Sequence, residues 1–528
     1  MTEAVASGPA SRQRASRRQP PAALLVLALI GPLIVLLPLA FTLFEAARVD
    51  GAEAVELLAR PLVGELLVNT IGLVLAATVA AATIGTAAAW LVERTDLPGY
   101  RAWGVLAAVP LAVPPFVSSY AWVSLSPGLQ DFAGAWLVVT CSYYPLVYLP
   151  VAAALRGLDP ALEETARSLG CGSCACFRSV VLPQLRPALL GGMLLVALNV
   201  LVEFGAFALL RFRTFTTELY AEYRTGFDGP GASLLAAVLL LLCLACLFAE
   251  VKVRGGAGYA RLGRGVRRRA ARLKLGLTTL PALAGFAALA MTTLGVPLGM
   301  IAYWLTQHGA AAISPAEASV SLLIDATISS LWLGLSGAAV TVALALPLGF
   351  VAVRYQSRFV TLLERMAYLA QGVPGIVVAL ALISLTIRAA YPLYQTTPLL
   401  IAAYAIVFLP LALVSVRAAL SQAQRGLEEA GRSLGLGWAA VAWRVLLPLI
   451  GPGLGAAAAL VFVSIITELT ATLLLAPIGT QTLATQVWAD TSTLAFAAAA
   501  PYAALMMALS LLSTWLLARR FAATRFVS

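Results

Sequence analysis

The stretch Leu162-Glu163-Glu164-Thr165-Ala166-Arg167-Ser168-Leu169-Gly170 returns later in the chain as Leu427-Glu428-Glu429-Ala430-Gly431-Arg432-Ser433-Leu434-Gly435. The two copies lie 265 residues apart, and the same offset relates Leu182-Pro183 to Leu447-Pro448 and Glu203 to Glu468. A constant offset over about forty residues indicates an internal repeat, in which one structural unit occurs twice. The sequence therefore predicts two copies of one fold unit in a single polypeptide.

Each copy has the pattern of a short helix followed by a turn. Glu164 and Glu429 suit the start of a helix, because a carboxylate complements the positive end of the helix dipole. Gly170 and Gly435 permit the left-handed residue that often ends a helix. A proline suits the first turn of the helix that follows. The pattern predicts a helix–turn–helix knob in each half, with these key residues: Glu163, Glu164, Ala166, Gly170, Leu182 and Pro183, then Glu428, Glu429, Ala430, Gly435, Leu447 and Pro448.

The rest of the chain is strongly apolar. Of its 528 residues, 61% are hydrophobic and only 11% are charged, whereas a soluble protein carries about 25% charged residues. The apolar residues form runs of about 20 residues, the length that an α-helix needs to cross a bilayer. We predict an all-α integral membrane protein with twelve spans, at about 21–43, 67–92, 102–124, 133–155, 189–210, 232–250, 276–306, 326–353, 363–387, 397–416, 453–476 and 497–518.

Basic segments divide these spans into two groups of six. Residues 1–20 form a basic start without a clear cleavage site, so the first apolar run is read as a membrane helix and not as a signal peptide. Residues 21–250 form the first transmembrane half, 251–275 a basic linker and 276–528 the second half.

The distribution of basic residues predicts the orientation. With both termini in the cytoplasm, most of the 35 Lys and Arg residues fall in cytoplasmic gaps, as the positive-inside rule requires. Both knobs then lie between the fourth and fifth helices of their halves, on the cytoplasmic side. This is a parallel repeat with a pseudo-two-fold axis along the membrane normal. Two equivalent knobs suit docking to a two-fold symmetric partner, although one such helix alone could equally lie on lipid headgroups.

Composition also bears on metals and nucleic acid. Three of the six cysteines, Cys171, Cys174 and Cys176, cluster after the first knob, but the single histidine, His308, is distant. We favour packing of small residues over a metal site, so no metal ligand is assigned. The net charge of +11 belongs mostly to cytoplasmic loops that would face anionic lipid, so no nucleic acid is expected as a partner.

At the repeated motif the sequence resembles the permease subunits of type I binding-protein-dependent ABC importers. Their signature is Glu-Ala-Ala, a glycine six residues after the glutamate, and Leu-Pro with its proline thirteen residues beyond. The first copy reads Glu164-Thr165-Ala166, Gly170 and Leu182-Pro183, and the second reads Glu429-Ala430-Gly431, Gly435 and Leu447-Pro448. Each copy departs at one alanine, by Thr165 or Gly431, and both replacements are small.

The resemblance implies partners and a mechanism. In that family each knob is a coupling helix that sits in a cleft of an ATPase subunit, so two ATPase copies and an extracytoplasmic binding protein are expected. ATP and Mg²⁺ would be bound by the ATPase, with no cofactor in this chain. The chain has no Gly-rich loop followed by Lys-Ser or Lys-Thr, so it is expected to be a transport subunit and not an enzyme. A bacterial inner membrane is the expected location.

Further stretches narrow the substrate. The fused halves, Glu203-Phe204-Gly205, Arg213–Glu218, Thr467–Leu475 and Gly479–Trp488 are similar to those of ferric-iron permeases. Thiamine permeases share much of this pattern, and phosphonate or polyamine importers also remain open. A twelve-helix secondary transporter is the rival class, but its repeated loop normally falls between the second and third helices of each half.

Two glutamates are candidates for the translocation pathway. Glu203 and Glu468 are predicted to lie inside the fifth and eleventh spans, where an ionisable group marks a pathway or a buried pair. Hard oxygen ligands suit Fe³⁺. The alternative is that each carboxylate only hydrogen-bonds a neighbouring helix. Several tyrosines are candidates either for further oxygen contacts or for anchoring at the membrane interface: Tyr120, Tyr143, Tyr144, Tyr148, Tyr220 and Tyr223.

Overall fold

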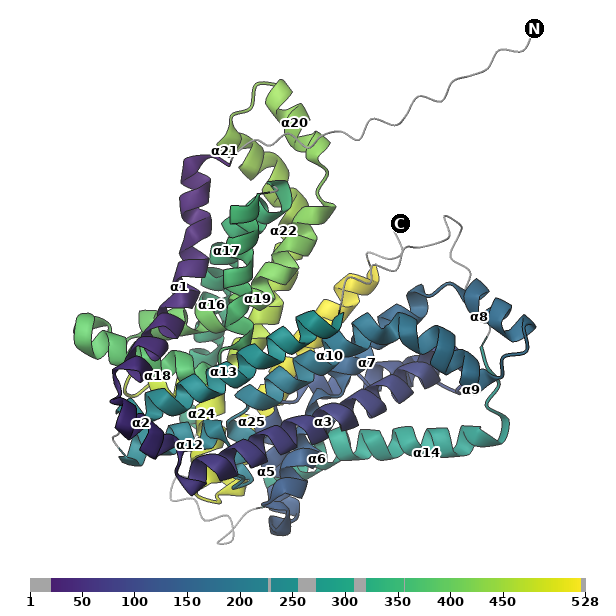
Figure 1. Ribbon diagram of the computed structural model, residues 1–528, viewed down its shortest axis with the longest axis horizontal. Coiled ribbons are helices and arrows are strands. Elements are labelled where there is room, and N and C mark those ends of the chain that lie inside the picture. Colours follow the sequence, from purple (N-terminus) through teal and green to yellow (C-terminus); the bar gives the residue numbers. More distant parts are fainter. Residues whose placement is uncertain (1–19, 227–228, 255–271, 308–319, 356, 524–528) are drawn as a thin grey trace.

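The structure is a computed structural model that describes residues 20–226, 229–254, 272–307, 320–355 and 357–523 (Figure 1). Within these ranges every regular element is helical, with one isolated bridge between Thr95 and Leu273. The expected all-α class is confirmed. Residues 1–19 of the basic start and 255–271 of the linker lie outside the described residues, as does His308.

Ten helical stretches in the described part are long and apolar enough to cross a membrane. Some of these stretches contain two consecutive helices that together form one span. The helices of the first half are α1 (Ala22–Arg48), α3 (Pro61–Arg94), α6 (Phe132–Tyr143) with α7 (Pro145–Gly157), α10 (Leu182–Val202) and α13 (Gly229–Arg254). Those of the second half are α14 (Thr279–Ala290) with α15 (Val296–Thr306), α16 (Val320–Arg354), α19 (Thr397–Gln422), α22 (Leu447–Ile466) and α25 (Phe496–Ala523).

The third and ninth predicted spans are bent. Helix α4 (Tyr100–Leu106) with the turn after it meets α5 (Pro115–Leu125) at 94°, and α17 (Arg358–Leu369) meets α18 (Gly375–Ala389) at 104°. The bends fall at Val113-Pro114-Pro115 and Val373-Pro374-Gly375. Proline lacks the N–H that continues a helix and disfavours helical geometry in the residue before it. The total of twelve holds when each bent pair is one span, but neither pair is a straight helix.

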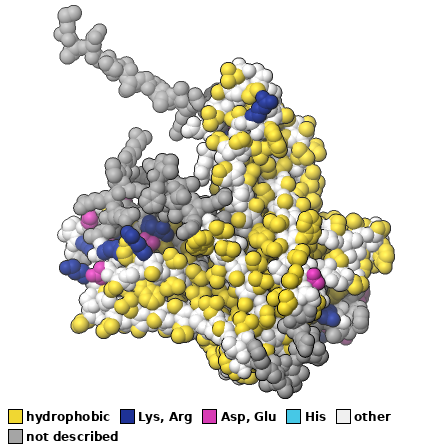
Figure 2. Space-filling view, turned by 180° about the vertical axis from the view of Figure 1, so that it is seen from behind, with side chains coloured by type: hydrophobic (Ala, Val, Ile, Leu, Met, Phe, Trp, Pro, Cys, Tyr) yellow, Lys and Arg dark blue, Asp and Glu magenta, His cyan; other side chains and the backbone are white. Residues whose placement is uncertain are grey.

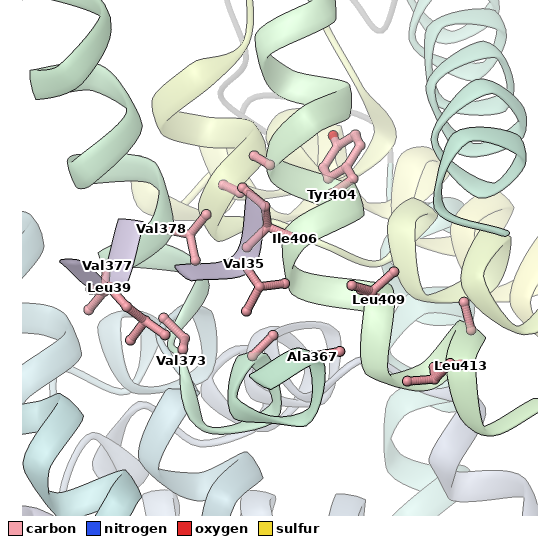
Figure 3. Packing of buried hydrophobic residues seen from close by; sticks show 14 of the residues in the cluster. Val35, Leu39, Ala367, Val373, Val377, Val378, Tyr404, Ile406, Leu409 and Leu413 are labelled. Atoms are coloured by element: carbon pink, nitrogen blue, oxygen red, sulfur yellow. The ribbon is translucent and has the colours of Figure 1, made fainter. Parts of the chain in front are cut away.

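The first helix of each half packs against the other half. Val35 and Leu39 of α1 are buried among α17, α18 and α19, next to side chains such as Val377 and Leu409 (Figure 3). Conversely, Phe286 of α14 is buried in the core of the first half, with its ring 5.5 Å from that of Trp103. The π-helical turn that continues α14, Met291–Gly295, packs against α6 of the first half. The predicted halves, 21–250 and 276–528, therefore exchange their first helices in space.

Short helices outside the spans form the two knobs. The first knob consists of α8 (Pro160–Ser168) and α9 (Ser173–Cys176), and the second consists of α20 (Arg425–Ser433) and α21 (Trp438–Val441). Figure 1 shows α8 and α20 at two separate projecting tips. On the face seen in Figure 2, apolar side chains cover the helices between the ends of the molecule, and the few charged side chains lie near those ends.

Candidate functional site

The two knobs have the same backbone geometry. Gly170 and Gly435 have φ of +87° and +85°, which confirms the expected left-handed helix ends. The N–H of Cys171 donates to Ala166 O at 3.0 Å, and that of Leu436 donates to Gly431 O at 3.1 Å. These bonds satisfy carbonyls that a helix end leaves free.

The knob helices begin earlier than the glutamates predicted to open them. Helix α8 starts at Pro160 and α20 starts at Arg425, four residues before Glu164 and Glu429. In α8 the Asp159 carboxylate accepts the N–H of Ala161 at 3.0 Å and caps the helix. Because Asp159 caps the helix, α8 begins before the motif. Glu163 and Glu164 therefore lie in the first half of α8, toward the positive end of its dipole.

Adjacent glutamates of each motif face opposite ways. Glu163 is buried and its Oε1 lies 2.8 Å from Nη2 of Arg94, at the end of α3. In the second half, Glu428 forms the equivalent ion pair with Arg354, at the end of α16. The next residues, Glu164 and Glu429, are exposed. The first glutamate of each pair thus attaches the knob to the protein body, while the second faces outward.

The outward surface of each knob also carries apolar residues. Leu169 and Leu434, which are equivalent in the repeat, are 80% and 83% exposed. Ala430 is exposed as well, and Ala166 is partly buried. Exposed leucines beside exposed carboxylates form a mixed surface suited to a protein partner.

Both Leu-Pro pairs lie in the first turn of a membrane helix, α10 or α22. Each follows one π-helical turn, Phe177–Val181 or Ala442–Leu446, in which Leu182 N–H donates to Phe177 O and Leu447 N–H donates to Ala442 O. The missing N–H of Pro183 and Pro448 explains why the regular pattern shifts here. The fifth and eleventh spans begin at Phe177 and Trp438, well before the predicted 189 and 453.

The sequence predicted Glu203 inside the fifth span. In the structure it lies directly after the end of α10, where the helix is interrupted. Its Oε1 accepts the N–H of Ala206 at 3.0 Å, at the start of α11 (Gly205–Leu209). Its Oε2 accepts the hydroxyl of Tyr143 in α6 at 2.6 Å. The backbone carbonyl of Glu203 accepts a third bond, from the Thr216 hydroxyl at 2.6 Å. The carboxylate therefore restarts the chain as a helix and ties it to α6.

Glu468 has the equivalent arrangement after α22. Its carboxylate accepts the N–H of Ala471 at 2.9 Å and the N–H of Thr472 at 3.0 Å, at the start of α23 (Thr470–Leu475). The Thr472 hydroxyl lies 2.9 Å from the carboxylate and 2.8 Å from the hydroxyl of Tyr404 in α19. The two carboxylates therefore share one local role, with Thr472 interposed in the second half. These contacts favour the alternative in which each glutamate bonds its surroundings.

Four helix breaks meet in the middle of the molecule. A side-chain atom placed on Gly205 would lie 2.8 Å from Leu469 and 3.0 Å from Phe116, and one placed on Gly375 would lie 3.4 Å from Glu468. The breaks after α10 and α22 therefore touch each other and the bends before α5 and α18. Sequence reasoning missed the bends, although the pairs Pro114-Pro115 and Pro374-Gly375 signal them. Interrupted helices at a repeat interface mark substrate sites in membrane transporters.

A cavity of about 280 Å³ lies next to these breaks, between the halves. Its aromatic wall contains Phe204 and Trp488, with ring centroids 5.3 Å apart, and Tyr220. Among the other described lining residues, Arg211 carries the one charge. The uncharged ones are Tyr120, Val123, Gln130, Ala208, Leu209, Thr217, Thr491, Ser492, Leu494 and Phe496.

Four of the six candidate tyrosines are buried, which does not fit anchoring at a lipid interface. They are Tyr120, Tyr143, Tyr144 and Tyr148. The hydroxyl of Tyr120 donates to Phe496 O at 2.9 Å and that of Tyr148 to Gly104 O at 3.0 Å. The hydroxyls of Tyr120, Tyr143 and Tyr148 thus bond to protein groups.

The cysteine cluster has no metal-site geometry in the part of the chain that is described. Cys171 is exposed and Cys176 is buried, whereas the Cys174 side chain lies outside the described residues. No group of three His, Cys, Asp or Glu side chains able to hold a metal ion occurs among the described residues.

Comparison with known proteins agrees with this architecture. Residues 85–252 and 342–522 each match the family described as binding-protein-dependent transport system inner membrane component. The chain is 39% identical over 502 residues to the Fe(3+)-transport system permease protein FbpB 2 of Haemophilus influenzae, covering 95% of this chain and 98% of that one. It is 31% identical over 237 residues to the sulfate transport system permease protein CysT of Escherichia coli, covering 41% and 85%. Both family matches begin after the exchanged first helices, and the chain belongs to this family of inner-membrane transport permeases, with two of its units fused in one multi-pass membrane protein.

Proposed function

We propose that this chain is the permease of an ATP-driven importer of ferric iron. The observation that carries the proposal is the pair of knobs, which have matching geometry, matching anchoring ion pairs and matching exposed leucines in both halves. The substrate is supported by the 39% identity to a relative named as an Fe(3+)-transport permease.

The knobs are the proposed docking sites for two copies of an ATPase subunit. ATP and Mg²⁺ are bound by those subunits, and this chain supplies no catalytic group and no cofactor site. A binding protein delivers the substrate on the opposite, extracytoplasmic side, and both termini face the cytoplasm. Closure of the ATPase pair on ATP biases two discrete arrangements of the halves, as coupling between distant sites requires.

The helix breaks at the centre are the proposed gate. Short helices and bends can tilt with smaller losses of backbone bonding than continuous helices, provided that side chains satisfy the freed groups. Glu203 and Glu468 supply such bonds to α11 and α23. We infer that they shape the gate and do not hold the iron, because their oxygens already accept bonds from the protein.

The substrate proposal is tested by uptake of radiolabelled ferric iron, thiamine and sulfate in cells with and without the gene. Loss of iron uptake alone supports the proposal. Loss of thiamine or sulfate uptake alone retains the importer and rejects iron as its substrate.

The docking proposal is tested by the double variant Glu164→Arg with Glu429→Arg. Charge reversal at two exposed positions should release the ATPase during purification and abolish uptake, without loss of the permease from the membrane. Retained ATPase together with normal uptake would reject the assignment of the knobs.

A further inference from the structure

Two arginines lie at equivalent places where the knobs meet the membrane helices. Arg94 is the last residue of α3, and Arg354 is the last residue of α16. Their side chains are only 5% and 8% exposed, and Nη2 of each faces the knob glutamate, Glu163 or Glu428. Burial of an ion pair is a poor source of stability, because desolvation of both charges offsets their attraction. The presence of this pair in both halves therefore calls for a role other than stability.

Each arginine also forms a hydrogen bond with a backbone group of a neighbouring segment, Arg354 through its side chain and Arg94 through its own carbonyl. In the second half, Nη2 of Arg354 donates to Ala423 O at 3.1 Å, two residues before α20 begins. In the first half, Arg94 O accepts the N–H of Leu273 at 2.8 Å, and Leu273 O accepts the N–H of Asp96 at 3.0 Å. The end of the linker is thereby fastened beside the Arg94–Glu163 pair. Both arginines are junctions where several segments are held together.

Close packing contacts connect α3 and α16, which carry these arginines, to the helix breaks. Along α3, Gly85 packs against the backbone at Tyr144, since a side-chain atom placed there would lie 2.9 Å from Tyr144 O. The preceding residue, Tyr143, donates to Glu203 at the break after α10. Helix α3 therefore contacts, within one residue, the tyrosine that bonds the first helix break.

The second half repeats this route with different residues. Along α16, a side-chain atom placed on Gly337 would lie 3.3 Å from the ring of Tyr404 and 2.7 Å from Ile465. Tyr404 bonds Thr472, which bonds Glu468 at the break after α22. In both halves one continuous helix joins a buried arginine at the knob to a tyrosine at the gate.

We propose that Arg94 and Arg354 are positioning residues for energy coupling. Each holds its knob rigidly on the end of α3 or α16, so that displacement of the knob by the ATPase moves that helix and, through Tyr143 or Tyr404, the helix break. The proposal rests on the docking of an ATPase at the knobs. The arginines do not form the docking surface, because they are buried beneath it.

The test uses the full chain with its ATPase, comparing the unmutated permease with Arg94→Ala combined with Arg354→Ala. Three quantities are measured: ATPase subunit retained per permease, ATP hydrolysis, and ferric-iron uptake per ATP hydrolysed. We expect retention and hydrolysis to persist, and uptake per ATP to fall by about tenfold or more, within the range of a typical coupling free energy. Arg94→Lys with Arg354→Lys should restore part of the uptake.

Exposed arginines in the helices that follow α3 and α16 provide the matched control. Arg101 in α4 and Arg358 in α17 are exposed, and their replacement by alanine should leave uptake per ATP unchanged. If the alanine pair fails to accumulate, Glu163→Gln with Glu428→Gln takes its place, because it removes the negative partner of each ion pair with little change of shape. Unchanged uptake per ATP in the variants would overturn the proposal. The proposal would also be overturned if bound ATPase and total uptake fell only as much as the amount of permease in the membrane fell.

Failure of the proposed function is recognised separately. An unmutated permease that retains no ATPase rejects docking, and one that retains ATPase but imports no iron rejects only the substrate. Both results are obtained before any arginine is changed.

Discussion

Gly170 and Gly435 hold a backbone conformation that other residues adopt only at a cost. At φ of +87° and +85°, an L-residue with a side chain is destabilised by about 1–2 kcal/mol. The two glycines end α8 and α20 and set the direction in which the outer surface of each knob points. Neither has another group within 4 Å of an added side-chain atom, so the strain lies in the backbone alone.

Gly170→Ala with Gly435→Ala should therefore weaken the knobs without disturbing the membrane helices. A loss of about 1–2 kcal/mol corresponds to a factor of about 5–30 in the population of the ordered knob. The measurement is ATPase retained per permease at increasing ATPase concentration. Gly172→Ala with Gly437→Ala is the matched control, since both positions are open and have no left-handed backbone. Equal retention in the two double variants would contradict the expectation.

Asp490 in α24 (Leu483–Ser492) is a partly buried carboxyl group outside the apolar spans. Burial raises its pKa to about 6, above the ordinary value of 3.8. The folded protein then binds more protons than the unfolded chain between these values. This contribution to stability is present at low pH and is lost as pH rises through the folded pKa.

Asp490→Asn should remove this pH dependence. At pH 7.5 the variant should unfold at a higher temperature than the parent, by an amount equivalent to about 1 kcal/mol after allowing for solvent screening at a half-exposed site. At pH 4 the two should be similar. Thermal unfolding of the detergent-solubilised protein at both pH values is the measurement, with Asp50→Asn at an exposed site as control. A parent and variant that differ equally at both pH values would refute the role of burial.

Each knob helix has an anchoring side and, opposite it, the side proposed to dock an ATPase subunit. Glu163 points toward α3 and Glu428 toward α16, while Leu169 and Leu434 at the far ends are largely exposed. Exposed leucines contribute little to folding, so substitutions there are expected to change stability by only about 0.5 kcal/mol. Under the docking proposed above, an ATPase subunit covers both leucines.

Leu169→Asp with Leu434→Asp should therefore release the ATPase while the permease accumulates normally. The readouts are ATPase retained after affinity purification and the amount of permease in the membrane. Val55→Asp, on the exposed helix α2 (Gly51–Leu58), places the same change at a site 68% exposed and remote from the knobs, so retention should be unaffected. If both variants retain ATPase equally, the leucines are not part of the docking surface.

The exchange of first helices makes the two halves depend on each other. Without the second half, Val35 and Leu39 of α1 would lose the side chains that bury them, and without the first half Phe286 of α14 would lose its neighbours. Lipid could cover this apolar surface, but it would not reproduce the close packing between helices that holds membrane proteins together.

Residues 1–254 or 272–528 expressed alone should consequently be degraded, whereas co-expression of both should restore a stable complex. The measurement is the amount of each half in membranes, with the intact chain as reference. Stable accumulation of either half alone would show that the exchanged helices are dispensable.

Local chemistry along the chain was sufficient to predict the helical class, the repeat, the knobs and the left-handed glycines. Long apolar runs need a bilayer, and a glycine after an amphipathic turn ends a helix, whatever lies elsewhere in the protein. The bends at Pro114-Pro115 and Pro374-Gly375 were predictable for the same reason, although their consequence for the spans was missed.

Three features required the tertiary structure. They are the packing of α1 and α14 against the opposite halves, the burial of Glu163 beside Arg94, and the position of Glu203 and Glu468 at neighbouring helix breaks. Adjacent glutamates look alike in the sequence, and only the end of α3 or α16 distinguishes the one that is buried from the one that is exposed. Each of these features depends on contacts between residues tens to hundreds of positions apart, whose free energies come from packing and from desolvation at sites that no local pattern identifies.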